Sequence, residues 1–144
     1  MEKFSFYTSE TATTHLDNSR LISRILVTVA TQKVPFAGTD AKVFLDLGTL
    51  GNFELNTPGE EDFEMGTIKS YEFKTDFTLG ELRKAVIELE HDNSGKNPGW
   101  CVGGVRIEIQ LQDSDLKYMY KLWEKIGWLD TGKSPYYSTA VQLQ

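Results

Sequence analysis

The chain has 144 residues, of which 40% are hydrophobic and 25% are charged, and its formal net charge is −6. This length suits one domain that buries a core without disulfides or a structural metal, and a single cysteine, Cys101, excludes an intrachain disulfide. The acidic balance argues against a nucleic-acid partner, because such binders usually carry a basic face, and against unaided attraction to an anionic membrane. We expect no signal peptide and no transmembrane segment in this sequence.

The first part of the chain differs from the rest. Residues 8–14 are rich in hydroxyl side chains and lack a helical period, and only residues 3–7 resemble a short strand. We therefore expect residues 1–20 to form an N-terminal extension that either adds an edge strand or stays mobile. The folded domain is expected to span residues 21–144.

From residue 21 onward, apolar and polar residues alternate with the period of a β-strand. The clearest run is 105–112, which has one apolar face along its whole length. Further strands are expected at residues 25–29, 43–47, 70–74, 85–90, 118–123, 128–129 and 136–143. The one expected helix is about a turn at residues 78–84.

Turn signals rich in Gly, Pro and Asn separate these runs, at residues 48–52, 57–59, 93–99 and 132–135. The 12% share of aromatic residues fits a pleated, half-buried surface. Short strands punctuated in this way predict an all-β protein, an antiparallel β-sandwich of about eight strands in two sheets.

Two short polar motifs each adjoin a strand-like run. One is the stretch from Phe36 to Asp40, and the other runs from His91 to Gly95 and is followed by Pro-Gly-Trp. Asp and Asn beside Gly turn the chain tightly and aim oxygens outward. Oxygen-rich loops are what calcium needs. Since neither motif pairs a nucleophile with a base, we expect a site that binds rather than one that reacts.

Together these motifs resemble the PLAT domain, the lipoxygenase-homology β-sandwich also found in polycystin and in clostridial alpha-toxin. The resemblance runs from about Ile22 to the C-terminus. It rests on the ordered stretches 36–40, 62–66 with 70–73, 79–82 with 91–95 and 98–100, and 128–129. It implies a two-sheet sandwich and a non-catalytic module that directs a partner domain to lipid, often with calcium.

The resemblance also implies where calcium would bind. The calcium loops of that family correspond here to Gly38, Thr39, Asp40, Asn56, Gly59, Asp62 and Asp92. Asp40, Asp62 and Asp92 would supply carboxylates, and Glu61 and Glu64 are near enough in sequence to substitute for them. The alternative is that the three aspartates are turn or capping residues that accept hydrogen bonds from nearby backbone amides.

Aromatic residues at loop tips form the second candidate group. A lipid-binding sandwich would insert an exposed Trp or Phe into the membrane interface. Phe36 is the expected membrane-contacting residue, and Phe53 is a weaker candidate. Trp100, Trp123 and Trp128 are expected to pack in or beside the core.

His91 lies beside Asp92, but the sequence offers no nucleophile or substrate proton for a histidine base to act on. We therefore expect His91 to end a strand and to bond within its own turn, and Cys101 to be a small buried hydrophobe. Two histidines and one cysteine cannot form a usual zinc site without carboxylates.

The sequence thus predicts a non-catalytic, calcium-assisted module that targets a lipid or membrane surface, with Phe36 entering the interface. The alternative is a protein–protein interaction module of a larger protein, in which calcium is structural or absent. The sequence predicts no compartment.

Overall fold

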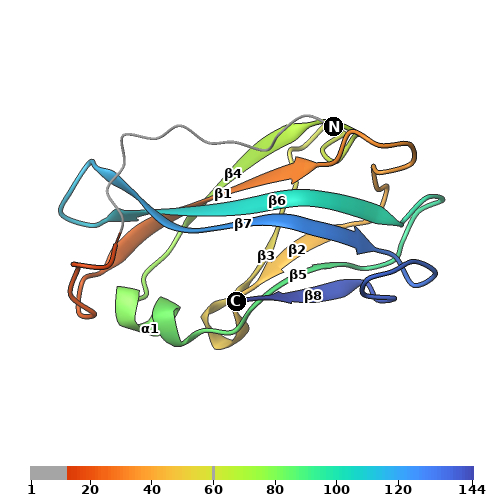
Figure 1. Ribbon diagram of the computed structural model, residues 1–144. Helices are drawn as coiled ribbons and strands as arrows, with labels where there is room; N and C mark the ends of the chain where they lie inside the picture. Colours follow the sequence, from red (N-terminus) through yellow and green to blue (C-terminus); the bar gives the residue numbers. More distant parts are fainter. Residues whose placement is uncertain (1–12, 60) are drawn as a thin grey trace.

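Figure 1 shows a computed structural model of the chain, which describes residues 13–59 and 61–144. These residues form eight strands and two short helical segments. The strands are β1 (Ile22–Thr31), β2 (Val43–Asp46), β3 (Asn52–Glu54), β4 (Ile68–Lys74), β5 (Ile87–His91), β6 (Trp100–Leu111), β7 (Lys117–Leu129) and β8 (Ala140–Leu143). The helical segments are the 3-10 turn η1 (Gly48–Leu50) and the helix α1 (Leu79–Lys84).

The strands form two four-stranded sheets with the orders β4-β1-β6-β7 and β3-β2-β5-β8. Every pairing within these sheets is antiparallel. The sheets enclose one hydrophobic core to which strands of both contribute. The prediction of an antiparallel β-sandwich of about eight strands in two sheets is confirmed.

The core forms because the alternating strands present their apolar faces to one another. On β6 the β-branched residues Val105, Ile107 and Ile109 are fully buried, and in the second sheet Leu45 of β2 lies opposite Leu89 of β5. Burying each of these side chains contributes about 1.5–3 kcal/mol relative to exposure. The period-two pattern in the sequence therefore becomes the inner face of a sheet.

Three elements differ from the sequence expectation. The short strand β3 begins inside a predicted turn, and with only three residues it is too short to show a period. β7 is one strand of 13 residues, not two, because β-bulges keep it paired with β6 past Lys125 and Gly127, which adopt φ of 56° and 100°. β8 is shorter than expected, because residues 136–139 lie outside the strand.

Residues 13–20 form turns that lie against α1. The guanidinium of Arg83 on α1 donates to the backbone oxygens of Thr13 at 2.7 Å and Leu16 at 3.0 Å, and to Oδ1 of Asn18 at 2.5 Å. These contacts tie this part of the expected extension to the domain. The expected short strand at residues 3–7 lies outside the described residues.

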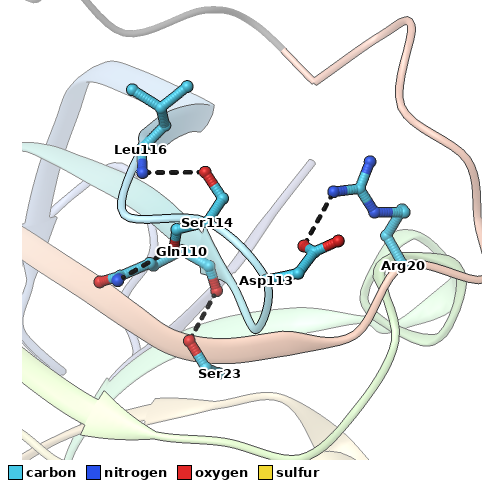
Figure 2. Close-up of polar contacts among 6 residues, drawn as sticks. All are labelled: Arg20, Ser23, Gln110, Asp113, Ser114 and Leu116. Carbon is cyan, nitrogen blue, oxygen red and sulfur yellow. Dashed lines mark hydrogen bonds and ion pairs between the residues drawn. The ribbon is translucent and has the colours of Figure 1, made fainter.

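The turn between β6 and β7 lies at the same end of the sandwich as α1, which we call the helix end. Figure 2 shows Arg20, just before β1, donating to Oδ1 of Asp113 in this turn at 3.0 Å. Beside this ion pair, Ser23 Oγ donates to the backbone oxygen of Gln110 at 3.2 Å. Polar groups at the helix end are thus largely paired with one another.

Within residues 13–59 and 61–144, no helix is long and apolar enough to cross a membrane.

Candidate functional site

The connections that carry the polar motifs gather at the end of the sandwich opposite α1, which we call the loop end. They are the β1–β2 connection (32–42), the β3–β4 connection (55–67), the β5–β6 connection (92–99) and the β7–β8 connection (130–139). Because each sheet is antiparallel, all four leave the strands at the same end. Figure 1 shows the first, third and fourth of them at the right of the view.

Backbone hydrogen bonds join three of these connections. The Thr39 amide donates to the backbone oxygen of Phe63 at 3.1 Å, and the Asp40 amide donates to that of Asn97 at 3.1 Å. A Cβ on Gly38 would lie 2.7 Å from the same Phe63 oxygen. Glycine at position 38 therefore permits the close approach of two loops.

Thr39 has a similar positioning role. Its hydroxyl donates to the backbone oxygen of Pro98 at 2.6 Å and accepts from the amide of Ala41 at 3.1 Å. The side chain is thus engaged with backbone on both sides. Only its backbone oxygen is left as a ligand of the kind that the resemblance implies.

A cavity of about 340 Å³ opens between the first two connections. Four of the predicted calcium ligands line it, namely Thr39, Asp40, Asn56 and Asp62, together with Glu54, Glu61 and Glu64. We call this space the carboxylate cavity. Gly38, Gly59 and Asp92 are not among its lining residues.

Three exposed carboxylates of this cavity influence one another. The pKa of Glu64 is raised above its ordinary value of 4.5, first by a hydrogen bond with the carboxyl of Glu61, then by repulsion from Glu61, with a smaller contribution from Asp40. A carboxyl whose pKa is raised by neighbouring negative charges costs more free energy to ionise than the same group alone in water. The cavity lining carries the five carboxylates of Asp40, Glu54, Glu61, Asp62 and Glu64 against the single ammonium of Lys42, an excess of negative charge that a hard cation would reduce.

Asp62 stabilises the β3–β4 connection that forms one wall of the carboxylate cavity. It is buried, and its two oxygens accept hydrogen bonds from the Thr57 amide at 3.0 Å and from the Tyr71 hydroxyl at 2.9 Å. This arrangement matches the alternative in which an aspartate caps a turn. Each oxygen keeps a second lone pair, so the carboxylate could contribute to an ion only from the side that these two donors leave open.

Asp92 is also a turn residue. Its Oδ1 accepts from the Lys42 amide at 3.0 Å, from the Ser94 amide at 3.1 Å and from the Ser94 hydroxyl at 2.5 Å. These hydrogen bonds, the one from the Ser94 hydroxyl first, lower the pKa of Asp92. Asp92 thus joins the β1–β2 and β5–β6 connections outside the carboxylate cavity.

Among the described residues, no three His, Cys, Asp or Glu side chains lie close enough together to hold a metal ion as a group. The oxygens of the carboxylate cavity are the right chemical type for calcium, which takes six to eight oxygen ligands. Asp40, Glu61 and Glu64 would have to draw closer to share one ion.

Phe36 projects from the loop end with 85% of its surface exposed. Its backbone has φ of 62°, which is unusual for a bulky residue. Phe53, the weaker tip candidate, instead packs on Phe73 with ring centroids 4.9 Å apart. Phe36 is therefore placed to contact a surface, as is Tyr137 of the β7–β8 connection, which is 64% exposed.

The tryptophans divide into two kinds. Trp100 is fully buried, donates to the Thr31 hydroxyl at 3.0 Å and meets Phe63 edge to face, as expected of a core residue. Trp123 and Trp128 are only partly buried. Trp128 reaches the loop end, where it lines a second cavity that the sequence analysis did not anticipate.

His91 ends β5 as expected and is buried. Its Nδ1 accepts from the Asn93 amide at 3.0 Å, so its Nε2 carries the proton and donates to the backbone oxygen of Leu129 at 2.8 Å. Both ring nitrogens therefore hold backbone in place. Cys101 is buried, and this burial raises the pKa of its thiol.

The fold and the loops define a β-sandwich domain whose polar connections meet at one end. The sequence model of the PLAT/LH2 domain matches residues 25–141. The chain therefore belongs to the PLAT/LH2 domain family, which confirms the resemblance drawn from its motifs. PLAT/LH2 domains are non-catalytic lipoxygenase-homology modules.

Relatives from the mouse contain a similar region. The chain is 41% identical over 85 residues to lipoxygenase homology domain-containing protein 1 of Mus musculus, covering 56% of this chain and 4% of the relative. It is 33% identical over 102 residues to the polycystin family receptor for egg jelly of Mus musculus, covering 68% of this chain and 5% of the relative. The chain thus spans only a small part of either relative.

Solved structures with a similar fold include bacterial toxins. The alpha toxin of Clostridium absonum superimposes with a TM-score of 0.54 at 16% identity, covering 78% of this chain and 33% of the toxin chain. The alpha toxin of Clostridium perfringens gives a TM-score of 0.55 at 12% identity, covering 77% and 33%. At these identities the similarity establishes the fold alone.

Proposed function

We propose that this domain is a non-catalytic module that binds a lipid or membrane surface with its loop end, assisted by calcium. The observation that carries the proposal is the Phe36–Asp40 stretch, which presents a ring that is 85% exposed and, four residues later, an exposed carboxylate. An exposed aromatic ring suits the membrane interface, and an exposed carboxylate suits a cation. One short connection thus carries both groups that such a surface requires.

Asp40, Glu61 and Glu64 are the side chains that would hold calcium. The first contributes from the β1–β2 connection and the other two from the β3–β4 connection, with Asn56 and the Thr39 backbone oxygen nearby. When bound, calcium would cancel the negative charge of the cavity and offer a positive site to a lipid phosphate. Asp62 and Asp92 contribute by fixing the loops that carry these ligands.

Phe36 would anchor the domain once the charge repulsion is removed. The chain has a formal charge of −6, so an anionic surface repels it as a whole. Calcium that neutralises the neighbouring carboxylates lowers this repulsion where the ring would enter the interface. Association with a phosphatidylserine surface should therefore be strongest when both the ring and the cation are present.

Co-sedimentation with vesicles of phosphatidylcholine and phosphatidylserine, in calcium or in chelator, tests the proposal. The domain should pellet in calcium and stay in solution in chelator, and both Asp40→Ala and Phe36→Ser should remain in solution. Asp115→Ala is a matched control, because Asp115 is an exposed carboxylate in the β6–β7 turn at the helix end. Equal pelleting with calcium and with chelator, or by Asp40→Ala and the native chain, would contradict the proposal.

A second candidate is a protein–protein interaction module, and the outer face of the second sheet favours it. There Asp46 of β2 lies directly opposite Glu88 of β5. The pKa of Glu90 is raised first by burial and then by repulsion from Asp46 and Glu88. Like charges opposite each other on a sheet are unfavourable, and a basic partner surface would relieve them.

Binding of a basic partner would respond to Glu88→Gln with Glu90→Gln, and not to Phe36→Ser. Both sets of variants can be compared in the same vesicle assay. When the lipid proposal is right, the loop-end variants should lose vesicle binding and the sheet-face variants should keep it. Absence of vesicle binding by the native domain, together with binding to immobilised polylysine that Glu88→Gln with Glu90→Gln weakens, would favour the protein-interaction module.

A further inference from the structure

A second cavity of about 400 Å³ lies at the loop end beside Phe36. It is formed by the β5–β6 and β7–β8 connections, with Phe36 from the β1–β2 connection at its edge. Its polar lining consists of Asn93, Lys96, Asn97, Asp130, Thr131 and Lys133. We call it the lysine cavity.

The lysine cavity is basic although the protein is acidic. Two lysines, Lys96 and Lys133, and a single carboxylate, Asp130, are among its lining residues. Neither lysine has an ion-pair partner within 4.0 Å in the part of the chain that the structure describes. In a chain with a net charge of −6, this cavity is a local site of positive charge.

Asp130 offsets only one of the two lysine charges, and one of its carboxylate oxygens is also engaged in its own turn. Its Oδ1 accepts from the Gly132 amide at 2.9 Å. This turn also shapes the segment that carries Lys133, whose amide donates to the Asp130 backbone oxygen at 3.1 Å. The carboxylate therefore acts as a turn residue that sets the position of the lysine.

Trp128 fixes the ammonium of Lys133. Its ring centroid lies 3.8 Å from the Lys133 Nζ, which is a cation–π contact. The Lys133 backbone oxygen also accepts from the Tyr137 amide at 3.0 Å. A lysine held in this way loses less conformational freedom when it binds an anion, so part of the cost of binding is already met in the free domain.

The remaining lining groups suit a phosphate. Asn93 provides a side-chain amide donor and Thr131 a hydroxyl. Asn97 donates one amide hydrogen to Asp40 Oδ2 at 3.5 Å, which leaves its second one for a ligand. Lysine binds phosphate as a point charge, without the planar match that a carboxylate finds in arginine. An uncrowded cavity with two ammonium groups and several neutral donors therefore fits a tetrahedral oxyanion better than it fits a metal cation.

We infer that the lysine cavity binds a phosphate group, and that it does so without calcium. The inference rests on the proposed function for the source of the phosphate, since Phe36 at the cavity edge would place the cavity at the level of lipid headgroups. The same chemistry would accept a free phosphate ester. The loop end would then have an anion site beside its cation site, on opposite sides of the Phe36–Asp40 stretch.

NMR amide titrations in chelator at constant ionic strength test the inference, with inorganic phosphate and glycerol phosphate as probes. Both probes should shift the resonances of residues 93–99 and 128–133. Lys96→Gln combined with Lys133→Gln should weaken binding by about tenfold or more, because each lysine supplies a charge-assisted hydrogen bond. Lys84→Gln, which removes an exposed lysine of α1 at the helix end, should leave the affinity unchanged.

Vesicles of phosphatidylcholine with and without phosphatidic acid, still in chelator, separate the two sources. Lysine-dependent pelleting with phosphatidic acid identifies a lipid headgroup, and lysine-dependent binding of the soluble probes alone identifies a free phosphate ester. No resonance shift with either soluble probe, or equal affinity in the double variant and the Lys84 control, would overturn the inference. Because calcium is absent throughout, phosphate binding can persist even if the calcium-dependent vesicle assay fails.

Discussion

The two ends of this sandwich differ in whether a carboxylate there has a cationic partner. At the helix end, Asp113 is paired with Arg20, and this hydrogen bond lowers the pKa of its carboxyl (Figure 2). At the loop end, Glu64 faces Glu61 and Asp40 instead of a cation, and its pKa is raised. The Asp113 carboxylate has a cationic partner within the chain, while the Glu64 carboxylate lies among like charges.

This difference indicates at which end the binding of an ion would gain the most free energy. A carboxylate that already has a cationic partner gives up that partner when it binds an ion, so the net gain is small. A carboxylate held near other carboxylates gains from any cation that approaches. The same reasoning applies to the unpaired lysines of the second cavity and an anion. The difference between the two ends therefore depends on whether charged side chains have partners of opposite charge, and not on residue type.

The largest expected effect is a loss of stability on replacing Asp62. This loop-end carboxylate already accepts hydrogen bonds within the domain. Asp62→Ala should destabilise the domain by about 1–3 kcal/mol, because the Thr57 amide and the buried Tyr71 hydroxyl each lose a hydrogen bond to this carboxylate. Urea unfolding measures the change. The neighbouring exposed Glu61→Ala is the control and should stay within about 0.5 kcal/mol of the native domain. If both variants lost equal stability, Asp62 would not differ from the exposed carboxylates.

A smaller effect is expected at the helix end, from Arg83. Arg83→Ala removes the hydrogen bonds to Thr13, Leu16 and Asn18 and should destabilise the domain by about 1 kcal/mol, since the arginine is solvent-exposed. Hydrogen exchange should show faster exchange of the Leu16 and Gly80 amides, which bond within this contact. The exposed Lys84 next to it provides a control, Lys84→Ala, that should leave these amides protected. Unchanged exchange in Arg83→Ala would show that the segment is held by other contacts.

The smallest effect concerns the titration of Glu64. In NMR titrations its pKa should lie above 4.5 in the native domain. Glu61→Gln should lower it clearly and Asp40→Asn should lower it less, following the order of the causes. Because the folded pKa is raised, Glu64 contributes stability below its unfolded pKa and loses that contribution as the pH rises through the folded pKa. Calcium should bind more weakly as the pH falls through this same range.

An unshifted Glu64 pKa in the native domain would remove the contrast between the two ends. A pKa that fell equally in Asp40→Asn and Glu61→Gln would show that Asp40 lies closer to Glu64 than the structure indicates.

Much of the fold was predictable because it depends on local alternation. Residues 105–111 show their inner face directly in the sequence, and the capping residues Thr78 and Glu81 mark the start of α1, where the Thr78 hydroxyl accepts from the Glu81 amide at 3.1 Å. β3 and the bulges of β7 were not predictable in this way. A three-residue strand has no period, and a bulge depends on pairing with β6 rather than on the sequence of β7.

The site was less predictable than the fold. The sequence singled out Asp40, Asp62 and Asp92 but could not tell which of these carboxylates already accept hydrogen bonds. The donors include the Tyr71 hydroxyl for Asp62 and, for Asp92, the Lys42 amide from another connection. The lysine cavity had no sequence signal. Lys96 and Lys133 come together only because two loops meet.

The left-handed backbone of Phe36 has a consequence for how this domain could change. A bulky residue at φ of 62° costs the folded chain on the order of 1–3 kcal/mol, a cost that glycine avoids. Substitution by glycine would therefore stabilise the folded domain and remove the aromatic ring from the loop end. On the function proposed above, selection for thermal stability and selection for membrane attachment would act in opposite directions at this one position.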